Sequence, residues 1–475
     1  MPRQQLRLAG PRPTEIQASL TELRRQMKIP VGYPDEVLAD AKRAIAAVEL
    51  PDADETAIEF LTIDPPESKD LDQALHIERR GSGYRVRYAI ADVAAFVAPG
   101  SPLDEEAHRR GVTLYAPDGN TRLYPPELSE GAASLLPGEL RPALVWTMDV
   151  DETGEGTDVH VRKARVRSRK KLDYGGVQHA LDDGSADEVL RLLREVGILR
   201  QQREARRGGV SLQLPEQEVM TAPDGYELSY RAPFPVEGWN AQISLMTGMA
   251  AAELMLEGEV GILRTVPAAD PARLERFRHT AKALGVLWPK DTPYPAFVRT
   301  LDANVPRQAA LLAAAAGVMR GSGYTAFDRH APSHAEHAAL ASTYAHTTAP
   351  LRRLVDRYVG ETCIALSEGR KVPGWVATEL PELPDVMELA DRRASQYEAG
   401  IVSAVEAALL EGSVGKTFEA VVIEVDRDGA AGSVELRDPA VTARCDGPGL
   451  PLGETVTVRC TLADVLKRQV RFALA

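Results

Sequence analysis

Residues 60–75 join a short apolar segment to a turn that carries three aspartates, and this combination restricts the chain more than any other stretch. The run Phe60–Ile63 is typical of a strand, and two prolines directly after Asp64 end it. Asp70 and Asp72 follow within the same turn. Carboxylates grouped at a strand end suit a hard cation such as Mg²⁺, which keeps positions free for water and phosphate. An acidic surface turn would use the same residue types, because Asp and Pro favour turns.

The length and composition of the chain predict a globular protein of several domains. With 475 residues, we expect two to four domains, one of them large. No run approaches the length of a transmembrane helix, and the N-terminus lacks the apolar core of a secretory signal. The three cysteines are too far apart for a disulfide framework or a zinc site. We therefore expect a cytoplasmic protein without membrane contact.

The charge of the chain limits how it could bind nucleic acid. A net charge of −13 argues against binding over the whole surface. A local basic channel stays open, because seven of the ten residues at 162–171 are Lys or Arg, and Arg352, Arg353 and Arg357 form a second group. A solvated strand or helix face would account for either group equally well.

Hydrophobic periodicity predicts an α+β protein of three parts. Helices expected at 14–28 and 35–48 make residues 1–50 a small helical domain, for which a helix-turn-helix is one candidate. Residues 51–411 form the large domain, which is rich in strands at first and then mostly helical. Short strands return over residues 412–475, where the turns rich in Gly and Asp predict an OB-fold barrel.

Within the large domain, two further expectations concern single segments. A buried helix is expected at 237–256, which is rich in Ala, Leu and Met. The proline-bounded segment 373–384 is expected to be a loop.

Seven segments in a fixed order carry a resemblance to a known family. They are residues 62–72, 89–93, 103–107, 110–115, 123–129, 134–135 and 344–356. In this order they resemble the ribonuclease II/R exoribonucleases and their RNB catalytic domain, over roughly residues 35–410. The usual C-terminal partner in that family is an OB-fold barrel of the ribosomal S-one type, which agrees with the strands expected after residue 412.

The resemblance implies an activity and a cofactor. Members of the family hydrolyse single-stranded RNA processively from the 3′ end and release nucleoside 5′-monophosphates. Mg²⁺ is the implied metal, with Mn²⁺ as an alternative, because a divalent cation lowers the pKa of bound water and neutralises the charge on the reacting phosphate. A protein that encloses its RNA in this way can work as a monomer, and we expect one.

The resemblance also assigns roles to single residues. Asp64, Asp70 and Asp72 match three of the family's four acidic positions, at which the metal is held. We assign Asp64 and Asp70 mainly as metal ligands, and Asp72 as the carboxylate whose loss stops turnover, either as a further metal ligand or by orienting the water. Arg352 matches a phosphate-binding arginine, whose planar fork suits phosphate oxygens. The remaining matches concern RNA binding: Tyr115 and Glu398 at the terminal nucleotide, Tyr174 at a base, and Arg353 as a contact to the RNA backbone or a structural residue.

The sequence departs from the family pattern at three places. Gln73 stands where the fourth acidic residue is expected, and its amide oxygen can bind Mg²⁺ but brings no charge. Leu212 stands where an aromatic side chain would stack on a base. Ser244, Leu245 and Ala251 replace a pair of glutamates and an asparagine on the helix at 237–256.

Two other functions stay open. A catalytically silent protein that retains the RNB fold and binds RNA would explain Gln73 and Leu212. A regulator whose N-terminal helices bind duplex nucleic acid is a third reading, and it rests on residues 1–50 alone.

Overall fold

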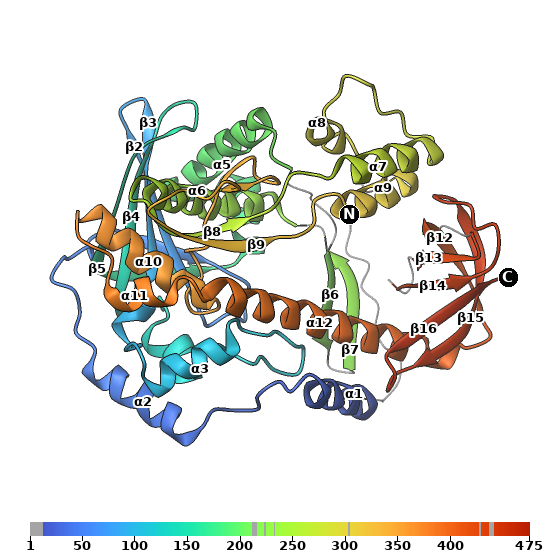
Figure 1. Ribbon diagram of the computed structural model, residues 1–475, viewed down its shortest axis with the longest axis horizontal. Helices are drawn as coiled ribbons and strands as arrows, with labels where there is room; N and C mark the ends of the chain where they lie inside the picture. Colours follow the sequence, from blue (N-terminus) through green and yellow to red (C-terminus); the bar gives the residue numbers. More distant parts are fainter. Residues whose placement is uncertain are drawn as a thin grey trace.

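Two closed five-stranded barrels lie on opposite sides of the computed structural model, and one long helix runs between them (Figure 1). The structure describes residues 13–210, 216–222, 225–231, 233–302, 305–426, 429–436 and 441–475. The α+β class expected from the sequence is confirmed. No helix in these ranges is long and apolar enough to cross a membrane.

The first barrel consists of β1 (Phe60–Ile63), β2 (Gln73–Arg80), β3 (Gly83–Ala91), β4 (Leu140–Val150) and β5 (Gly156–Leu172). Neighbouring strands are antiparallel except β1 and β5, whose parallel pairing closes the barrel. All four residues of β1 are buried, which agrees with its mostly apolar sequence, in which Thr62 is the one polar residue. The barrel closure places the end of β1 and the start of β2 together, and the aspartate-bearing turn connects them.

The basic run at 162–171 lies on β5 and follows the alternation of a strand. Val161, Ala164 and Val166 are buried, and the basic residues between them are more exposed. Several of these side chains end in ion pairs: Arg162 with Glu55, Lys163 with Asp92 and Glu361, Arg165 with Asp54, and Lys170 with Asp187. The run is therefore largely neutralised by neighbouring acids, and its part in an RNA channel stays a prediction.

Helices cover the first barrel. They are α3 (Pro102–Arg110), α4 (Tyr174–Asp183), α5 (Glu188–Arg207), α6 (Pro235–Glu257) and α10 (Leu354–Ser367). The buried helix expected at 237–256 is α6, which packs against α5 and α10. Short strands complete this region: β8 (Val260–Thr265), β9 (Gly323–Asp328), β10 (Glu336–His337) and β11 (Ser342–Thr343). A separate two-stranded sheet of β6 (Glu216–Ala222) and β7 (Gly225–Arg231) lies beside the long helix α12 (Leu383–Leu410) (Figure 1).

A smaller helical unit has its own core. It consists of α7 (Pro271–Ala283), α8 (Tyr294–Val298) and α9 (Pro306–Ala316), which pack around Phe277, Phe297 and Leu311. The helix α9 contacts the second barrel, so the unit bridges the two sides of the molecule (Figure 1).

The long connecting helix is α12 (Leu383–Leu410). Immediately before it, the sequence predicted a loop at 373–384, and this prediction was wrong, because α11 (Gly374–Glu379) lies there. Prolines and a glycine suggested a loop, but proline fits the first turn of a helix. Val376 and Leu380 are buried four residues apart, which is the spacing of one helix face.

The second barrel has the strand order of an OB fold. Its strands are β12 (Thr417–Val425), β13 (Ala431–Leu436), β14 (Thr442–Asp446), β15 (Thr455–Asp464) and β16 (Gln469–Leu474). They follow the order β12-β13-β14-β16-β15, with β14 and β16 parallel. The predicted barrel is confirmed. Phe418 and Phe472 meet edge to face inside it, so neither forms an exposed stacking platform.

The N-terminal helices α1 (Pro13–Gln26) and α2 (Asp35–Ala47) pack onto the body of the molecule. Ile16, Leu20 and Val37 belong to the same continuous core as the first barrel. Ser19 Oγ also donates a hydrogen bond of 2.8 Å to the carbonyl of Val465, beside the second barrel. The described part of residues 1–50 thus shares its core with the rest of the chain.

One glycine determines how closely a critical loop approaches α6. A Cβ atom on Gly248 would lie 2.2 Å from the Tyr344 ring and 2.5 Å from the carbonyl oxygen of Ala345. We expect Gly248→Ala to lower the free energy of unfolding by about 2–3 kcal/mol, because overpacking outweighs the gain in helix propensity. Urea denaturation measures this. The matched control is Gly374→Ala, where an added Cβ meets nothing within 4 Å; equal effects in both variants would contradict the argument.

Candidate active site

The carboxylate of Asp72 connects two segments that are distant in the sequence. Its Oδ1 accepts a hydrogen bond of 2.7 Å from the backbone N–H of Leu351, and its Oδ2 accepts one of 2.7 Å from Arg352 Nε. Only 1% of Asp72 is exposed. Burial raises the pKa of Asp72 to about 7, and the Arg352 charge and the Leu351 N–H oppose this shift. Burial lowers the pKa of Arg352, but the charge of Asp72 outweighs this effect and raises it overall, so Arg352 stays protonated.

The loop that carries Leu351 and Arg352, residues 344–353, is held along its length. The N–H of Ala345 donates to the carbonyl of Gly248 over 3.0 Å, and the Gln73 side chain donates to the carbonyl of Thr348. The carbonyl of Arg352 accepts from the N–H of Thr113 over 2.9 Å. The loop of residues 344–353 is therefore fixed to α6, to β2 and to the segment that precedes Tyr115.

The three arginines at positions 352, 353 and 357 differ in what they contact. Arg353 forms two hydrogen bonds to Asp356, and Arg357 pairs with Asp104 over 2.5 Å. Arg352 uses its Nε for Asp72, and 40% of its side chain is exposed. Of the three, Arg352 has the arrangement best suited to a phosphate, because its paired nitrogen fixes the guanidinium while the side chain still reaches solvent.

The turn of residues 64–72, which we call the acidic turn, is fastened to the end of β5. The N–H of Asp64 donates to the carbonyl of Leu172 over 3.1 Å, and Lys171 Nζ donates to the carbonyls of Pro66 and Ser68 over 2.5 and 2.6 Å. Ser134 Oγ adds a bond of 2.6 Å to the carbonyl of Lys69. These bonds hold the aspartates at the end of the barrel where β1 stops.

Asp64 holds a buried carboxylate oxygen for which the described part of the chain offers no hydrogen bond. Burial raises the pKa of Asp64 to about 6, while Arg352 lowers it and Asp70 raises it. The three side chains therefore lie within electrostatic reach of one another. A buried anionic oxygen without a donor costs free energy, and a cation would remove that cost.

The acidic turn fits an open metal site better than an enclosed one. Among the described residues, no three His, Cys, Asp or Glu side chains come together closely enough to hold an ion by themselves. Mg²⁺ commonly takes only one or two carboxylates from the protein and completes its shell with water and phosphate. Asp64 and Asp70 suit that arrangement, whereas both oxygens of Asp72 already accept hydrogen bonds.

Two tyrosines expected to contact RNA lie near this group. Tyr115 is 49% exposed, and its hydroxyl is close enough to Arg352 to interact with it. Tyr174 begins α4 and accepts a hydrogen bond of 3.3 Å from Asn240 on α6. Burial raises the pKa of Tyr174, and the negative charge of Asp64 adds to this shift. Both rings therefore border the acidic turn.

The other predicted RNA-binding residues are placed differently. Glu398 is exposed on α12, and the structure leaves its predicted role untested. Leu212 lies outside the described residues. Ser244, one of the departures on α6, shares a hydrogen bond of 2.8 Å with Tyr88 of the first barrel.

Sequence reasoning missed several contacts that build the site. Lys171 was part of a basic run with no distinct role, and nothing in the sequence indicates which backbone carbonyls it reaches. The backbone N–H of Leu351 donates to Asp72 whatever side chain stands at that position, so the sequence does not indicate this contact. Asn240 is a polar residue within a buried helix, and this contrast was the one available signal.

Comparison with known proteins identifies the family. The model of the RNB domain matches residues 53–366, and the model of the RNase II-type exonuclease C-terminal S1 domain matches residues 416–475. Since the first match covers well over half of the chain, the chain belongs to the RNB domain family.

Individual relatives are more distant. Ribonuclease R of Aquifex aeolicus is 25% identical over 97% of this chain and 71% of its own length. Exoribonuclease 2 of Vibrio vulnificus is 33% identical, over 35% of this chain and 26% of its own length. The chain thus spans 71% of the length of the ribonuclease R and 26% of the length of the exoribonuclease 2.

Solved structures of two other proteins share the fold. RNase R of Mycoplasma genitalium, solved in its apo form and with ribose-methylated single-stranded RNA, aligns with a TM-score of 0.86, 17% identity, and coverage of 97% of this chain and 78% of its own. Yeast Ssd1, described as a pseudonuclease, aligns with a TM-score of 0.68, 16% identity, and coverage of 93% and 57%. At these identities the likeness concerns the fold alone.

The raised pKa of Asp64 predicts a pH dependence of stability in metal-free buffer. The folded chain keeps a proton up to about pH 6 that the unfolded chain, with an ordinary pKa of 3.8, has already lost. The contribution of Asp64 to stability is therefore present below pH 4 and is lost as the pH rises to about 6. Asp64→Asn should remove this loss, which is roughly 3 kcal/mol.

Thermal or urea denaturation across pH 4–7 with a chelator tests this, as the difference between variant and wild type. Asp158→Asn, at an exposed position of β5, is the matched control. A difference for Asp64→Asn that does not change with pH would show that Asp64 has an ordinary pKa.

Proposed function

We propose that the chain is a processive 3′-to-5′ exoribonuclease that hydrolyses single-stranded RNA to nucleoside 5′-monophosphates with a divalent metal, Mg²⁺ or alternatively Mn²⁺. The observation that carries this proposal is the bridge from Asp72 to Leu351 and Arg352. It sets a guanidinium suited to phosphate beside the carboxylates of Asp64 and Asp70. The names of the relatives, ribonuclease R and exoribonuclease 2, support an exonuclease that acts on RNA.

Each residue has a task that its surroundings support. Asp64 and Asp70 would hold the metal, which supplies an activated water and neutralises charge on the phosphate. Arg352 binds a phosphate oxygen through its remaining N–H groups, and preorganised donors of this kind stabilise charge that develops during the reaction. Asp72 fixes the orientation of Arg352 and supplies a negative charge next to it.

The RNA would be bound without reading its sequence. Stacking on aromatic rings contributes about 1–3 kcal/mol per base and accepts any base. Tyr115, half exposed beside Arg352, is suited to the terminal nucleotide, and Tyr174 to the base that precedes it. We propose that the protein acts as a monomer in the cytoplasm, with Arg353 supporting the loop through Asp356. Glu398 keeps its proposed contact to the terminal nucleotide.

A catalytically silent RNA-binding protein is the alternative. Gln73 favours it, because the amide stands in place of an acidic residue and already donates to Thr348. The fold of yeast Ssd1, a pseudonuclease, is similar enough to make this alternative concrete.

Variants at two positions separate the two functions. With 3′-labelled single-stranded RNA and Mg²⁺, the wild type should release mononucleotides. Asp72→Asn should abolish release, because the neutral amide no longer balances Arg352, and Arg352→Lys should reduce the rate by about 10²–10³-fold, because the bidentate fork is lost. Filter binding should show RNA binding retained in both.

The matched control is Arg329→Gln, an exposed position whose side chain is 84% solvent accessible. If the wild type binds RNA and releases no mononucleotide, the silent RNA-binding protein is the correct function. Continued turnover by Asp72→Asn would move the catalytic role to another residue.

The metal can be tested apart from activity. At pH 7, Mg²⁺ at ten times its dissociation constant should stabilise the wild type by about 1.4 kcal/mol, because it binds the folded chain alone. Differential scanning calorimetry with and without Mg²⁺ measures this shift. Asp64→Asn and Asp70→Asn should each abolish it, and Asp158→Asn should keep it. Equal stabilisation of all four proteins would show that the ion binds elsewhere.

A further inference from the structure

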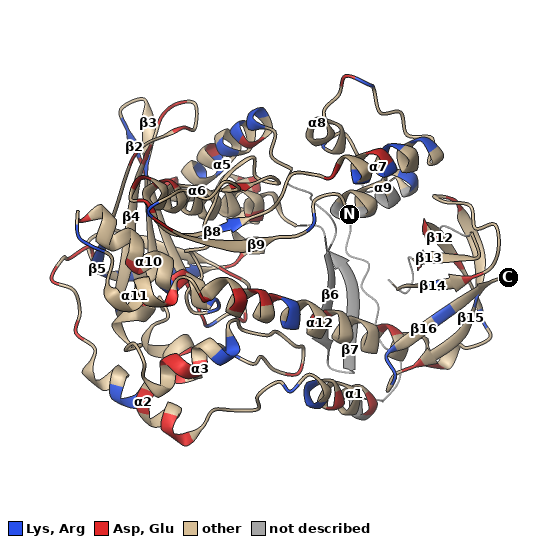
Figure 2. Cartoon of the chain, viewed as in Figure 1, with Lys and Arg blue, Asp and Glu red and all other residues tan. Residues whose placement is uncertain are grey.

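A second cluster of arginines lines a cavity far from the acidic turn. The cavity, which we call the arginine cavity, has a volume of about 360 Å³ and is lined by Arg200, Arg203, Arg206 and Arg207 of α5, with Glu155 and Glu253 as the acidic residues. Four guanidinium groups against two carboxylates give it a positive excess in a chain of net charge −13. Figure 2 shows several Lys or Arg positions, in blue, along the ribbon of α5.

The arginine cavity is separate from the candidate active site. Met148, which lines it, pairs with Val86 on β3. Asp72 is bonded through its carbonyl to the N–H of Ala91, at the other end of the same strand. Val86 and Ala91 are five residues apart on this strand, which places the arginine cavity about 17 Å from Asp72.

Two buried N–H groups of the arginine cavity have no acceptor within the described part of the chain. They are Nε of Arg200 and one terminal nitrogen, Nη2, of Arg207. Arg200 is 5% exposed, and its other nitrogens contact the carbonyl of Gly154 over 2.8 Å and the sulfur of Met249 over 3.6 Å. Buried charged donors without acceptors are costly, and an unseen ion or ligand is one of the few explanations.

The neighbouring acids do not supply the missing acceptor. Glu155 is paired with Arg203. Glu204, the buried acid on α5, accepts from Gln242 over 2.6 Å. Burial lowers the pKa of Arg200 to about 10, the charge of Arg207 adds to this shift, and the charges of Glu253 and Glu204 oppose it without reversing it. The charge of Arg200 is thus less well balanced than that of Arg352, and arginines that merely complement the end of α5 would not require Arg200 to be buried.

The remaining wall of the arginine cavity is apolar and rich in methionine. Met148, Met246 and Met249 lie there with Val159. Methionine adapts to flat ligands and makes favourable contacts between sulfur and aromatic rings. Guanidinium forks match phosphate oxygens in a bidentate manner. A volume in the range of small-molecule sites leaves room for both parts of one ligand.

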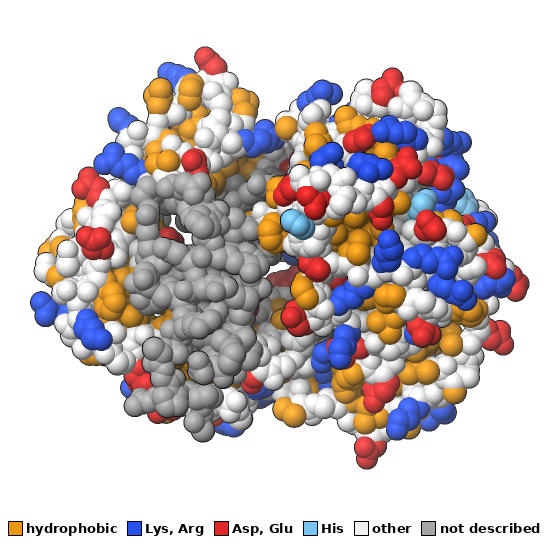
Figure 3. Space-filling view, turned by 180° about the vertical axis from the view of Figure 1, so that it is seen from behind, with side chains coloured by type: hydrophobic (Ala, Val, Ile, Leu, Met, Phe, Trp, Pro, Cys, Tyr) orange, Lys and Arg blue, Asp and Glu red, His pale blue; other side chains and the backbone are white. Residues whose placement is uncertain are grey.

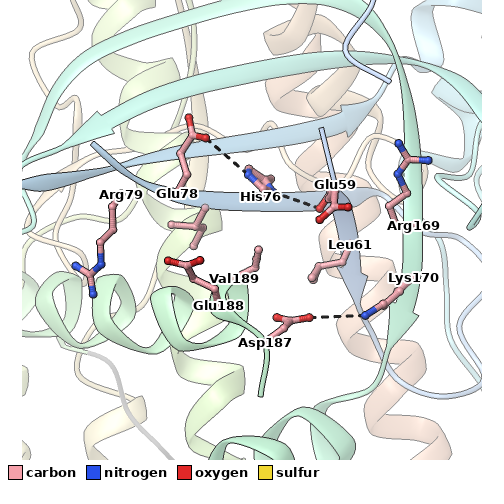
Figure 4. A pocket seen from close by; sticks show the side chains of 11 residues that line it. Glu59, Leu61, His76, Glu78, Arg79, Arg169, Lys170, Asp187, Glu188 and Val189 are labelled. Atoms are coloured by element: carbon pink, nitrogen blue, oxygen red, sulfur yellow. Dashed lines mark hydrogen bonds and ion pairs between the residues drawn. The ribbon is translucent and has the colours of Figure 1, made fainter. Parts of the chain in front are cut away.

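A second cavity shows what a satisfied pocket looks like. It lies beside β1, β2 and the start of α5, and charges of both signs line it (Figure 4). Lys170 approaches Asp187 over 3.8 Å, and His76 contacts the carbonyl of Glu59 over 3.3 Å. The second cavity thus contains pairs of opposite charge, whereas Arg200 and Arg207 of the arginine cavity each keep a buried N–H without an acceptor among the described residues.

We propose that the arginine cavity binds a phosphate monoester with an aromatic group, of which a nucleoside 5′-monophosphate is the representative. The guanidinium groups of Arg200, Arg206 and Arg207 receive the phosphate, and the methionine wall receives the ring. The existence of the site is independent of the proposed nuclease activity. Its identification as a second site for the reaction product rests on that proposed function.

Isothermal titration calorimetry on the full chain tests the site, with adenosine 5′-monophosphate, inorganic phosphate and adenosine as separate probes. We expect adenosine 5′-monophosphate to bind more tightly than inorganic phosphate, and adenosine to show no binding. Arg206→Gln should weaken binding by about tenfold or more, because it removes a charged donor to the phosphate. Arg203→Gln should weaken it to a similar extent, because it leaves the negative charge of Glu155 unpaired beside the phosphate. Neither variant removes a buried side chain, so both should fold, which circular dichroism checks.

Two controls locate the binding. Arg194→Gln lies on α5 outside the arginine cavity and should leave the affinity unchanged, as should Asp72→Asn in the candidate active site. Unchanged affinity in Arg203→Gln and Arg206→Gln would overturn the proposal, as would equal binding of inorganic phosphate and the nucleotide. RNA degradation without added nucleotide is measured in parallel and should be unaffected in Arg206→Gln. Degradation without nucleotide binding overturns the site alone, and nucleotide binding without degradation overturns the function alone.

Discussion

The bridge from Asp72 to Leu351 and Arg352 is the interaction on which the candidate active site depends. It joins residues 280 positions apart, and both carboxylate oxygens take part. Breaking a buried ion pair on one side typically costs about 3–5 kcal/mol, since the remaining charge stays buried. The bridge can form only because the loop is held elsewhere, by Gly248, Gln73 and Asp356. Packing of α6 therefore sets the position of the group best suited to bind phosphate.

The sequence was a good guide to elements and a partial guide to the site. Apolar alternation located the strands and the long helices, because those patterns have fixed periods. It failed at α11, where prolines suggested a loop although two buried residues keep a helical spacing. Asp64 and Asp72 were indicated by the grouping of carboxylates at a strand end, whereas the role of Arg352 came from the resemblance of whole segments. Which arginines are already paired depends on contacts between distant elements, and no local pattern records those. On the face of the molecule shown in Figure 3, acidic and basic side chains are interspersed.

Gln73 shows that a departure from a family pattern has to be interpreted together with the contacts around the residue. By residue type it is an absent carboxylate. In the structure its amide donates to the carbonyl of Thr348, on the loop that carries Arg352. A carboxylate cannot donate there when ionised, and its charge would face a carbonyl oxygen. The glutamine thus contributes to the same arrangement as Asp72, by holding the loop rather than by adding charge to a metal site.

The same physical rule applies at two distant places in the molecule. At the acidic turn, a buried oxygen of Asp64 has no donor in the described chain, and at the arginine cavity, buried nitrogens of Arg200 and Arg207 have no acceptor there. Elsewhere, the buried carboxylate of Asp356 accepts hydrogen bonds from Arg353 and from the N–H of Ala349. Because pairing is the general pattern for buried polar groups, unpaired buried atoms are informative where they lie beside an open turn or a cavity. The charges at these two places are opposite in sign, and a cation at the first and a phosphate at the second would complete each with a ligand that suits a protein acting on RNA.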